Sequence, residues 1–565
     1  MFLTPPGARA GSQTPPMAGL PGIYPASHWL GLASDRASDL PRDLMAIYCS
    51  DSDTVEQRRD RIASLARTYL SRFGDGPVVV ARAPGRVNLL GRHIDHQGGY
   101  CNMLAIERDL YVMAGLRADP KLLMVNLEPT RFGEASSNIR EILPGYAGEP
   151  WRAYVDSQPV RDQATRDAGQ WQQYVKAPLA RFMAAWPDLR WTGLNVAAAG
   201  DVPVAAGLSS SSALVVSVAE AMAALYGINL APEVFAETCG EAEWYVGARG
   251  GSGDQAAMKF ARAGCIVQIG FHPMKVGQAA PWPPGYALLV CNSGIEARKS
   301  AGARNTFNQR VASYHLAREM VRRAHPEIAD RVIHLRDLTP YHLGVSDADA
   351  AQYLLDIPAR ISRRHIIEEL GESIAGPFLA SHTWESGEYA LRAVAAFGLA
   401  ECERSRQCAD LLHQGDVDRV GRLMRISHDG DRVTASADGV FGPEGKCYCD
   451  EATRELIGRC RNGMHLAEEP GAYACSTPEI DLMVDIALAV PGVVGAQLSG
   501  AGLGGCMMVL AHESAIPGVA AALEQSYYAP REQQPDMQVC RPVAGSGTLM
   551  SDGRCGHNLP HGVDA

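Results

Sequence analysis

The sequence predicts an α+β protein of two lobes, built from mixed sheets and helices. Three observations support this fold class. The 565 residues are enough chain for two or three domains with ample core. Strand-like and helix-like patterns are mixed along the chain, which favours sheets covered by helices. No internal repeat is found, so a solenoid or propeller is not expected.

The composition is that of a globular protein, with 46% hydrophobic and 20% charged residues. The net charge of −11 offers no basic surface for nucleic acid, and no apolar run is long enough to span a membrane. The fourteen cysteines follow no disulfide framework and no secretory signal is recognised, so we expect reduced thiols and a cytoplasmic protein. Cys447, Cys449, Cys460 and His465 come nearest to a metal cluster, but their spacing matches no standard zinc site.

Both ends of the chain are predicted to lie outside the folded lobes. The first 34 residues contain no acid and are rich in Pro, Gly, Ser and Ala, so residues 1–42 are expected to be a disordered tail. Residues 546–565 are expected to be a flexible tail. The remaining chain divides into an N-terminal domain, 43–285, and a C-terminal domain, 286–545.

In the N-terminal domain, residues 51–73 carry apolar side chains at helical spacing. Val78–Ala83 reads as a strand that should stop at Pro84-Gly85. The other elements expected in this domain are strands at 111–116 and 194–198 and helices at 212–226 and 232–246, each helix closed by a glycine.

In the C-terminal domain, a strand is expected at 286–291, followed by a helix at 306–324 and mainly helical chain to 427. Residues 429–474 are rich in glycine and charge and are expected to be an insertion. The chain should end with a helix at 480–490 and strands at 493–498 and 506–510.

Four consecutive serines, Ser209 to Ser212, follow Gly207 and precede a long apolar run. The first N–H groups of a helix lack internal partners and the helix dipole is positive there, so this segment is suited to bind a nucleotide phosphate. A serine hydroxyl would be free to ligate Mg²⁺. No lysine follows the glycine, which excludes the common NTPase loop. A serine-rich linker or an ordinary helix cap remains the alternative.

The segment Gly500-Ala-Gly-Leu-Gly-Gly505 fits the Gly-x-Gly-x-x-Gly pattern of dinucleotide-binding folds. That fold needs a helix directly after the glycines, whereas Cys506–Leu510 has the pattern of a strand. The pattern therefore favours a loop in which glycines permit close backbone approach.

Three motifs in fixed order, at 82–99, 203–213 and 498–506, resemble those of the GHMP kinase superfamily, and within it the galactokinase-like sugar kinases. The first contains Gly85-Arg-Val-Asn-Leu89 and then Gly91-Arg-His-Ile-Asp95. Further matches lie at 251–255, 292–310 and 476–482, so the resemblance runs from about residue 78 to 542. It implies a two-lobed fold with the active site in the cleft between the lobes. It also implies ATP- and Mg²⁺-dependent phosphorylation of a sugar at its anomeric hydroxyl.

Asp254 is the expected catalytic base, because transfer of a phosphoryl group to a sugar hydroxyl needs the acceptor proton removed or steered. Arg86 is its expected partner, a fixed cation that keeps the carboxylate ionised and meets developing negative charge. The resemblance assigns the same pair. Without it, Asp254 would be read as a turn residue and Arg86 as a surface cation.

Phosphate and metal ligands are expected at the serine and glycine segments and one nearby acid. The ATP-binding residues are expected to be Gly207, Leu208, Ser209, Ser210, Ser211, Ser212, Ala213, Gly500, Gly502 and Gly504. Mg²⁺ would be held by Ser211 or Ser212 together with Glu243. The spacing from Glu243 to Asp254 differs by one residue from the family pattern, so Glu241 stays open as the ligand.

The sugar pocket is expected to contain His93 and Asp95, with help from Gly98 and Gly99, because a carboxylate can accept from two adjacent hydroxyls. A metal site formed by His93, Asp95 and His96 is the alternative, although it lacks a remote fourth ligand.

Two departures from the family bear on the choice of sugar. Galactokinases carry Glu where this chain has Arg92, and Tyr where it has Phe307. Because arginine pairs with carboxylates in bidentate geometry, we hypothesise a hexuronic acid such as galacturonate, with Arg92 on its carboxylate. The alternative is that Arg92 turns away to an ion pair and a neutral sugar such as galactose binds.

Other functions compatible with the motifs are a catalytically silent regulator that binds sugar and ATP, and another small-molecule kinase of the superfamily. The presence of the serine segment, Arg86 and Asp254 favours the enzyme. The expected partner is a small-molecule sugar, with no nucleic acid or membrane, for a protein that is a monomer or homodimer.

Overall fold

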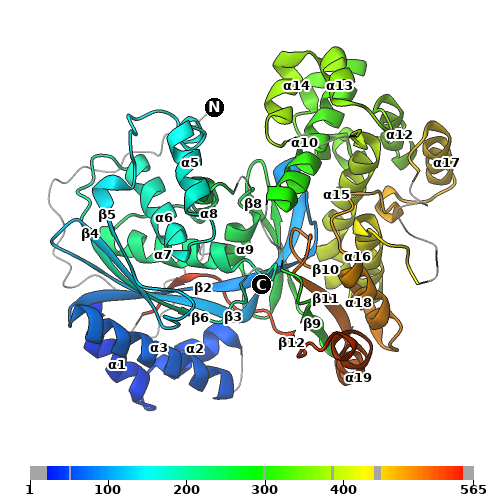
Figure 1. Ribbon diagram of the computed structural model, residues 1–565. Helices are drawn as coiled ribbons and strands as arrows, with labels where there is room; N and C mark the ends of the chain where they lie inside the picture. The colour runs from blue at the N-terminus through cyan, green and yellow to red at the C-terminus, as the bar shows by residue number, and fades with distance from the viewer. Residues whose placement is uncertain are drawn as a thin grey trace.

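The computed structural model describes residues 22–49, 52–204, 206–248, 250–296, 301–383, 387–437, 439 and 447–550. The chain forms two lobes, one around a nine-stranded sheet and the other around a four-stranded sheet (Figure 1). This confirms the predicted α+β class with mixed sheets and helices. The change from one sheet to the other falls between β8 (Lys275–Pro281) and β9 (Tyr286–Asn292), at the predicted lobe boundary.

The N-terminal sheet is organised around two long antiparallel strands, β2 (Pro77–Leu90) and β3 (Tyr100–Leu116). The expected stop at Pro84-Gly85 is wrong, because β2 continues to Leu90 after a register shift between Pro84 and Arg86. Such an irregularity accommodates a proline, which has no N–H for the ladder. The same sheet also contains β4 (Lys121–Asn126), β5 (Ala135–Asn138), β6 (Leu194–Gly200), β7 (Cys265–Gly270) and β8.

Helices cover both faces of this sheet (Figure 1). One face carries α1 (Ala26–Ser34), α2 (Leu40–Tyr48) and α3 (Ser52–Phe73). The other carries α4 (Trp151–Val155), α5 (Gln158–Arg166), α6 (Trp171–Ala185), α7 (Ser210–Tyr226), α8 (Pro232–Glu243) and α9 (Gly253–Phe260). The apolar side chains of each layer therefore lie against the sheet, as the helical spacing of 51–73 predicts.

The prediction that residues 1–42 form a disordered tail is wrong for residues 22–42. They contain β1 (Tyr24–Pro25), α1 and the start of α2, and the Trp29 side chain is fully buried against the sheet. The Trp29 ring supplies a large apolar contact, which the composition of this segment does not indicate. Residues 1–21 lie outside the described residues.

The C-terminal end of the chain returns to the N-terminal lobe. Val543 bridges to Ala105, and β13 (Gly547–Thr548) pairs with β2. The prediction of a flexible tail is therefore wrong for residues 546–550, where Ser546 is buried and also donates to Glu220 at 2.7 Å. The remaining residues, 551–565, lie outside the described part of the chain.

The C-terminal sheet has the strand order β10 (Val493–Leu498), β11 (Cys506–His512), β9 and β12 (Met537–Cys540). One face packs on α18 (Pro478–Leu488) and α19 (Ile516–Leu523), and the other on α16 (Val417–Asp431). The remaining helices rise beside the sheet (Figure 1): α10 (Ala301–Ala324), α11 (Pro340–Leu343), α12 (Asp347–Gln352), α13 (Arg363–Leu370), α14 (Glu372–Leu379), α15 (Leu391–His413) and α17 (Asp450–Arg461). The expected insertion at 429–474 therefore includes a helix, α17.

Among the described residues, none of the helices combines the length and apolar character needed to cross a membrane. The cysteines in the described ranges are all free thiols, as predicted.

Candidate active site

The predicted pair Arg86 and Asp254 is in direct contact through two guanidinium nitrogens and one carboxylate oxygen. Arg86 Nε donates to Asp254 Oδ1 at 2.7 Å, and Arg86 Nη2 lies 2.6 Å from the same oxygen. The guanidinium is 8% exposed and also donates through Nη1 to the carbonyl of Gly207 at 2.8 Å. The Asp254 side chain is 34% exposed, so the carboxylate is oriented by arginine while remaining open to a ligand.

The serine segment lies beside this pair. Ser209 is the residue before α7 and has left-handed backbone angles, and its hydroxyl does not cap the helix. Instead the Ser209 hydroxyl donates to Asp254 Oδ2, a contact that no sequence pattern predicts. The helix begins at Ser210, two residues earlier than predicted, and its N-terminus has no side-chain cap from Ser209.

The glycine loop of the C-terminal lobe packs directly on the serine segment. Cys506 N–H donates to the Ala206 carbonyl at 3.1 Å. A Cβ on Gly207 would lie 2.9 Å from the Ser499 carbonyl, and one on Gly500 would lie 2.8 Å from the Gly207 carbonyl. Side chains at these positions would separate the two backbones. Gly500, Gly502 and Gly504 all have positive φ, which favours glycine at each.

Asp95 lies next to the loop that leads into α9. A Cβ on Gly253 would lie 3.0 Å from Asp95 Oδ2, and one on Gly251 would collide with the same oxygen. The structure thus brings the Asp95 carboxylate against the backbone turn that leads directly to Asp254. Burial raises the pKa of Asp95, but the hydrogen bond and charge of His96, 3.1 Å away, outweigh it and lower the pKa to about 2.

Arg92 does not face the site, and the hypothesis that it binds a substrate carboxylate is wrong for this structure. The guanidinium is 1% exposed. Nη2 contacts Asp431 Oδ2 at 2.9 Å and Ser427 Oγ at 3.0 Å, while Nη1 donates to Gln497 Oε1 and to the Leu498 carbonyl. Sequence could not show this, because Asp431 lies 339 residues away.

His93 is also buried, with its side chain 2% exposed. Its ring stacks on Tyr473 with 4.1 Å between ring centroids, and Nε2 lies 3.4 Å from Asp431 Oδ1. A direct contact between His93 and a sugar is therefore not supported by this arrangement, whereas Asp95, 23% exposed, keeps access. Neither Asp431 nor Tyr473 carries a sequence signal that would have identified it.

The other residues predicted for the sugar site are Gly98, Gly99 and Phe307. The Gly98 carbonyl accepts from Arg336 Nη1 at 2.6 Å, and a Cβ on Gly98 would lie 2.9 Å from the Arg336 side chain. A Cβ on Gly99 would collide with Ile94. These glycines are thus explained by packing. Phe307, on α10, is half-buried.

The two candidate metal-binding acids have different surroundings. Glu241 Oε2 accepts from Arg181 Nε at 2.7 Å, so its carboxylate is engaged in an ion pair. Glu243 is buried and accepts from Gln255, the residue after Asp254, at 2.6 Å. This arrangement favours Glu243. Within the ranges the structure describes, no three His, Cys, Asp or Glu side chains are grouped to hold a metal ion.

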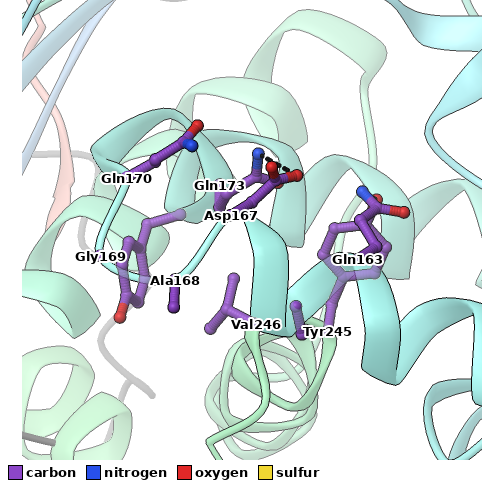
Figure 2. Close-up of a pocket in the computed structure, with 10 residues that line it drawn as sticks. Gln163, Asp167, Ala168, Gly169, Gln170, Gln173, Tyr245 and Val246 are labelled. Carbon is purple, nitrogen blue, oxygen red and sulfur yellow. Dashed lines mark hydrogen bonds between the residues drawn. The ribbon is translucent and has the colours of Figure 1, made fainter. Parts of the chain in front are cut away.

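A small pocket lies elsewhere on the N-terminal lobe (Figure 2). It is lined by residues of α5, the chain before α6, α6 itself and the turn after α8, and Gln173 donates to Asp167 at its edge at 3.0 Å. Its volume of about 20 Å³ holds about one water molecule, so it cannot take a sugar.

Three family models match this chain. The galactokinase galactose-binding signature matches residues 67–116, the GHMP kinase N-terminal domain matches 173–262, and the GHMP kinase C-terminal domain matches 448–529. The first two contain Arg86, Asp95, the serine segment and Asp254.

Known galactokinases are similar to this chain in sequence, and one of known structure is similar in fold. The chain is 27% identical over 491 residues to a galactokinase of Roseiflexus sp. (strain RS-1), covering 87% of this chain and 98% of that one. It is 25% identical to a galactokinase of Bos taurus, covering 84% and 93%. The crystal structure of Lactococcus lactis galactokinase complexed with galactose has a similar fold, with a TM-score of 0.61 at 20% identity, over 86% of this chain and 100% of that chain.

The family models therefore support a kinase of the GHMP superfamily. Within that superfamily, the galactose-binding signature and the relatives support a galactokinase-like sugar kinase.

Proposed function

We propose that the protein transfers the γ-phosphoryl group of ATP to the anomeric hydroxyl of a galactose-type neutral hexose. The observation that carries this proposal is the contact of one carboxylate, Asp254, with both Arg86 and the serine before α7. A proton acceptor, a fixed cation and a phosphate-binding helix end are thereby within one site.

In this proposal the nucleotide phosphates lie on the first turn of α7, next to the glycine loop. The N–H groups of Ser210, Ser211 and Ser212 would donate to phosphate oxygens, and the helix dipole would stabilise their charge. The glycines at 500, 502 and 504 would let the C-terminal lobe close over this region without side-chain clashes.

The donor set also fits Mg²⁺. Serine hydroxyls at positions 211 and 212 and the Glu243 carboxylate are hard oxygen ligands, which Mg²⁺ prefers alongside phosphate oxygens and water. When bound, the ion would neutralise charge on the phosphates. Glu243 is oriented for this role by its hydrogen bond with Gln255.

The sugar would lie between Asp95 and Asp254. Asp95 would accept hydrogen bonds from two adjacent sugar hydroxyls, and its low pKa keeps it ionised near neutral pH. Asp254 would accept or orient the proton of the anomeric hydroxyl, and Arg86 would offset the charge that develops on the transferring group. Because the guanidinium of Arg92 is buried in an ion pair, a uronate carboxylate finds no partner there, which favours a neutral sugar.

The test is sugar-dependent ATP consumption by the purified protein with Mg²⁺, measured with galactose, galacturonate, glucuronate, arabinose and fucose. We expect turnover with galactose and none with the uronates. Phosphorylation at the anomeric position would be verified by loss of the reducing end. Turnover with galacturonate alone would contradict the choice of a neutral sugar, and silence with every sugar would contradict the proposed reaction.

A further inference from the structure

Two buried carboxylates of the C-terminal lobe contact the loop that follows β2, residues 91–95. Glu401, on α15, accepts through Oε1 from the N–H groups of Gly91 at 2.7 Å and Arg92 at 3.2 Å. Its side chain is fully buried. A carboxylate that accepts from two successive backbone N–H groups fixes the direction of the chain at that point.

The second carboxylate, Asp431 at the end of α16, holds the side chains of the same loop. It contacts Arg92 Nη2 at 2.9 Å and lies 3.4 Å from His93 Nε2. Burial raises its pKa, but His93 and Arg92 outweigh burial and lower the pKa well below the ordinary value. Asp431 is therefore ionised at neutral pH although it is fully buried.

The buried side chains at this loop include two positive and two negative charges. Arg404 Nε donates to Glu401 Oε2 at 2.7 Å, and its Nη1 donates to the carbonyls of Ala467 and Glu469. Arg92 and Arg404 thus balance Glu401 and Asp431. Removal of any one member leaves a buried charge without compensation, which is costly. We call Glu401, Asp431 and Arg404 the loop clamp.

The loop needs such support. His93 has a φ of 64°, a left-handed conformation that costs a non-glycine residue roughly 1 kcal/mol or more. Two residues later, Asp95 begins a short 3₁₀ turn and presents its carboxylate beside Gly251 and Gly253, in the turn before Asp254. A change in the direction of the loop at residues 91–93 would move this carboxylate.

We propose that Glu401 and Asp431 are positioning residues of the C-terminal lobe that set the place of Asp95 in the N-terminal lobe. The inference rests on the proposed function, in which Asp95 binds the sugar. It gives Asp431, and the Tyr473 ring that stacks on His93, a part in sugar affinity.

The experiment compares three variants of increasing severity with a matched control. Two change the loop clamp and one changes Ser427, which contacts Arg92 beside it; we call all three the clamp variants. Ser427→Ala removes one contact to Arg92, Glu401→Gln keeps an acceptor but removes the charge, and Asp431→Asn removes the charge that faces Arg92 and His93. The control is Asp109→Asn, which breaks another fully buried ion pair, with Arg82 at 2.6 Å, inside the N-terminal lobe.

Two measurements are made on the full-length protein. The first is the KM for sugar and the KM for ATP of each variant. Because misplacement of a ligand group by about 1 Å can cost on the order of a hundredfold, we expect the sugar KM to rise about twofold for Ser427→Ala and about ten- to a hundredfold for Asp431→Asn. The KM for ATP should stay within about twofold, since the clamp makes no contact with the serine segment.

The second measurement is amide hydrogen exchange of residues 91–95 without any substrate. We expect faster exchange in the clamp variants and none of this local change in Asp109→Asn. If the folded variants keep the wild-type sugar KM and loop exchange, the proposal is overturned. If loop exchange rises but the wild type phosphorylates no sugar, the clamp stands and the proposed function fails. Because Ser427→Ala is mild, the comparison holds even if a charge variant does not fold.

Discussion

Two arginine–aspartate pairs have arginines that lie close together in the sequence, Arg86 and Arg92. The pairs differ in the exposure of their side chains and in the lobes that they join. Arg86–Asp254 joins β2 to α9 within one lobe, and its carboxylate is 34% exposed. Arg92–Asp431 joins the loop after β2 to the other lobe, with side chains 1% and 0% exposed. The same two residue types therefore form an open site in one place and a closed structural contact in the other.

The difference teaches that the residue types alone do not identify a substrate site. Arg92 uses its terminal nitrogens on Asp431, Ser427, Gln497 and a carbonyl, which leaves nothing to bind a ligand. Asp254 is held by Arg86 and Ser209, but its side chain stays 34% exposed. Access to solvent, set by the packing of the lobes, separates the two roles.

The largest effect is expected at the open pair. Asp254→Asn keeps the shape of the side chain but removes its ability to accept a proton, so kcat should fall by about 10²- to 10⁴-fold. The thermal midpoint should change little, because the carboxylate is partly exposed. Steady-state kinetics and thermal unfolding of the same preparation provide the check. A variant with near-wild-type kcat would remove Asp254 as the base.

A large effect on stability is expected at the closed pair. Asp431→Leu alone leaves the charge of Arg92 buried without a counter-charge and should lower the free energy of unfolding by about 3–5 kcal/mol. Adding Arg92→Met removes the unpaired charge, so the double variant should recover most of that loss.

Urea unfolding of the wild type, both single variants and the double variant provides the measurement. If the two single losses simply add in the double variant, the pair has no mutual dependence and the contrast with Arg86–Asp254 disappears.

The smallest effect concerns Asp95, whose exposure of 23% lies between those of the two aspartates. Its pKa is lowered from 3.8 to about 2, so its contribution to stability is present above about pH 4 and is lost as the pH falls toward 2. Over that window the wild type should lose up to about 2 kcal/mol more than Asp95→Asn. Urea unfolding between pH 2 and pH 5 tests this, and parallel curves for the two proteins would contradict the low pKa.

Much of the fold followed from local patterns. The helices α3, α7 and α8 and the strands β9, β10 and β11 lie within a few residues of their predicted ranges, since each carries a clear apolar pattern, and glycine directly follows α3 and α7. The failures have a common cause. The helices at 22–42 form because distant chain covers their apolar side chains, and the strand at 547–548 forms because its backbone pairs with the distant β2. Composition shows neither contact.

The sequence by itself determined the family, the order of the motifs and the residue types of the site, because these depend on short segments whose chemistry is local. The tertiary structure alone decided which of those residues face a ligand. It placed Asp95 beside the glycine turn before Asp254, paired Arg92 and His93 with Asp431, and brought Ser209 onto Asp254. The physical reason is that exposure and pairing depend on contacts between residues hundreds of positions apart.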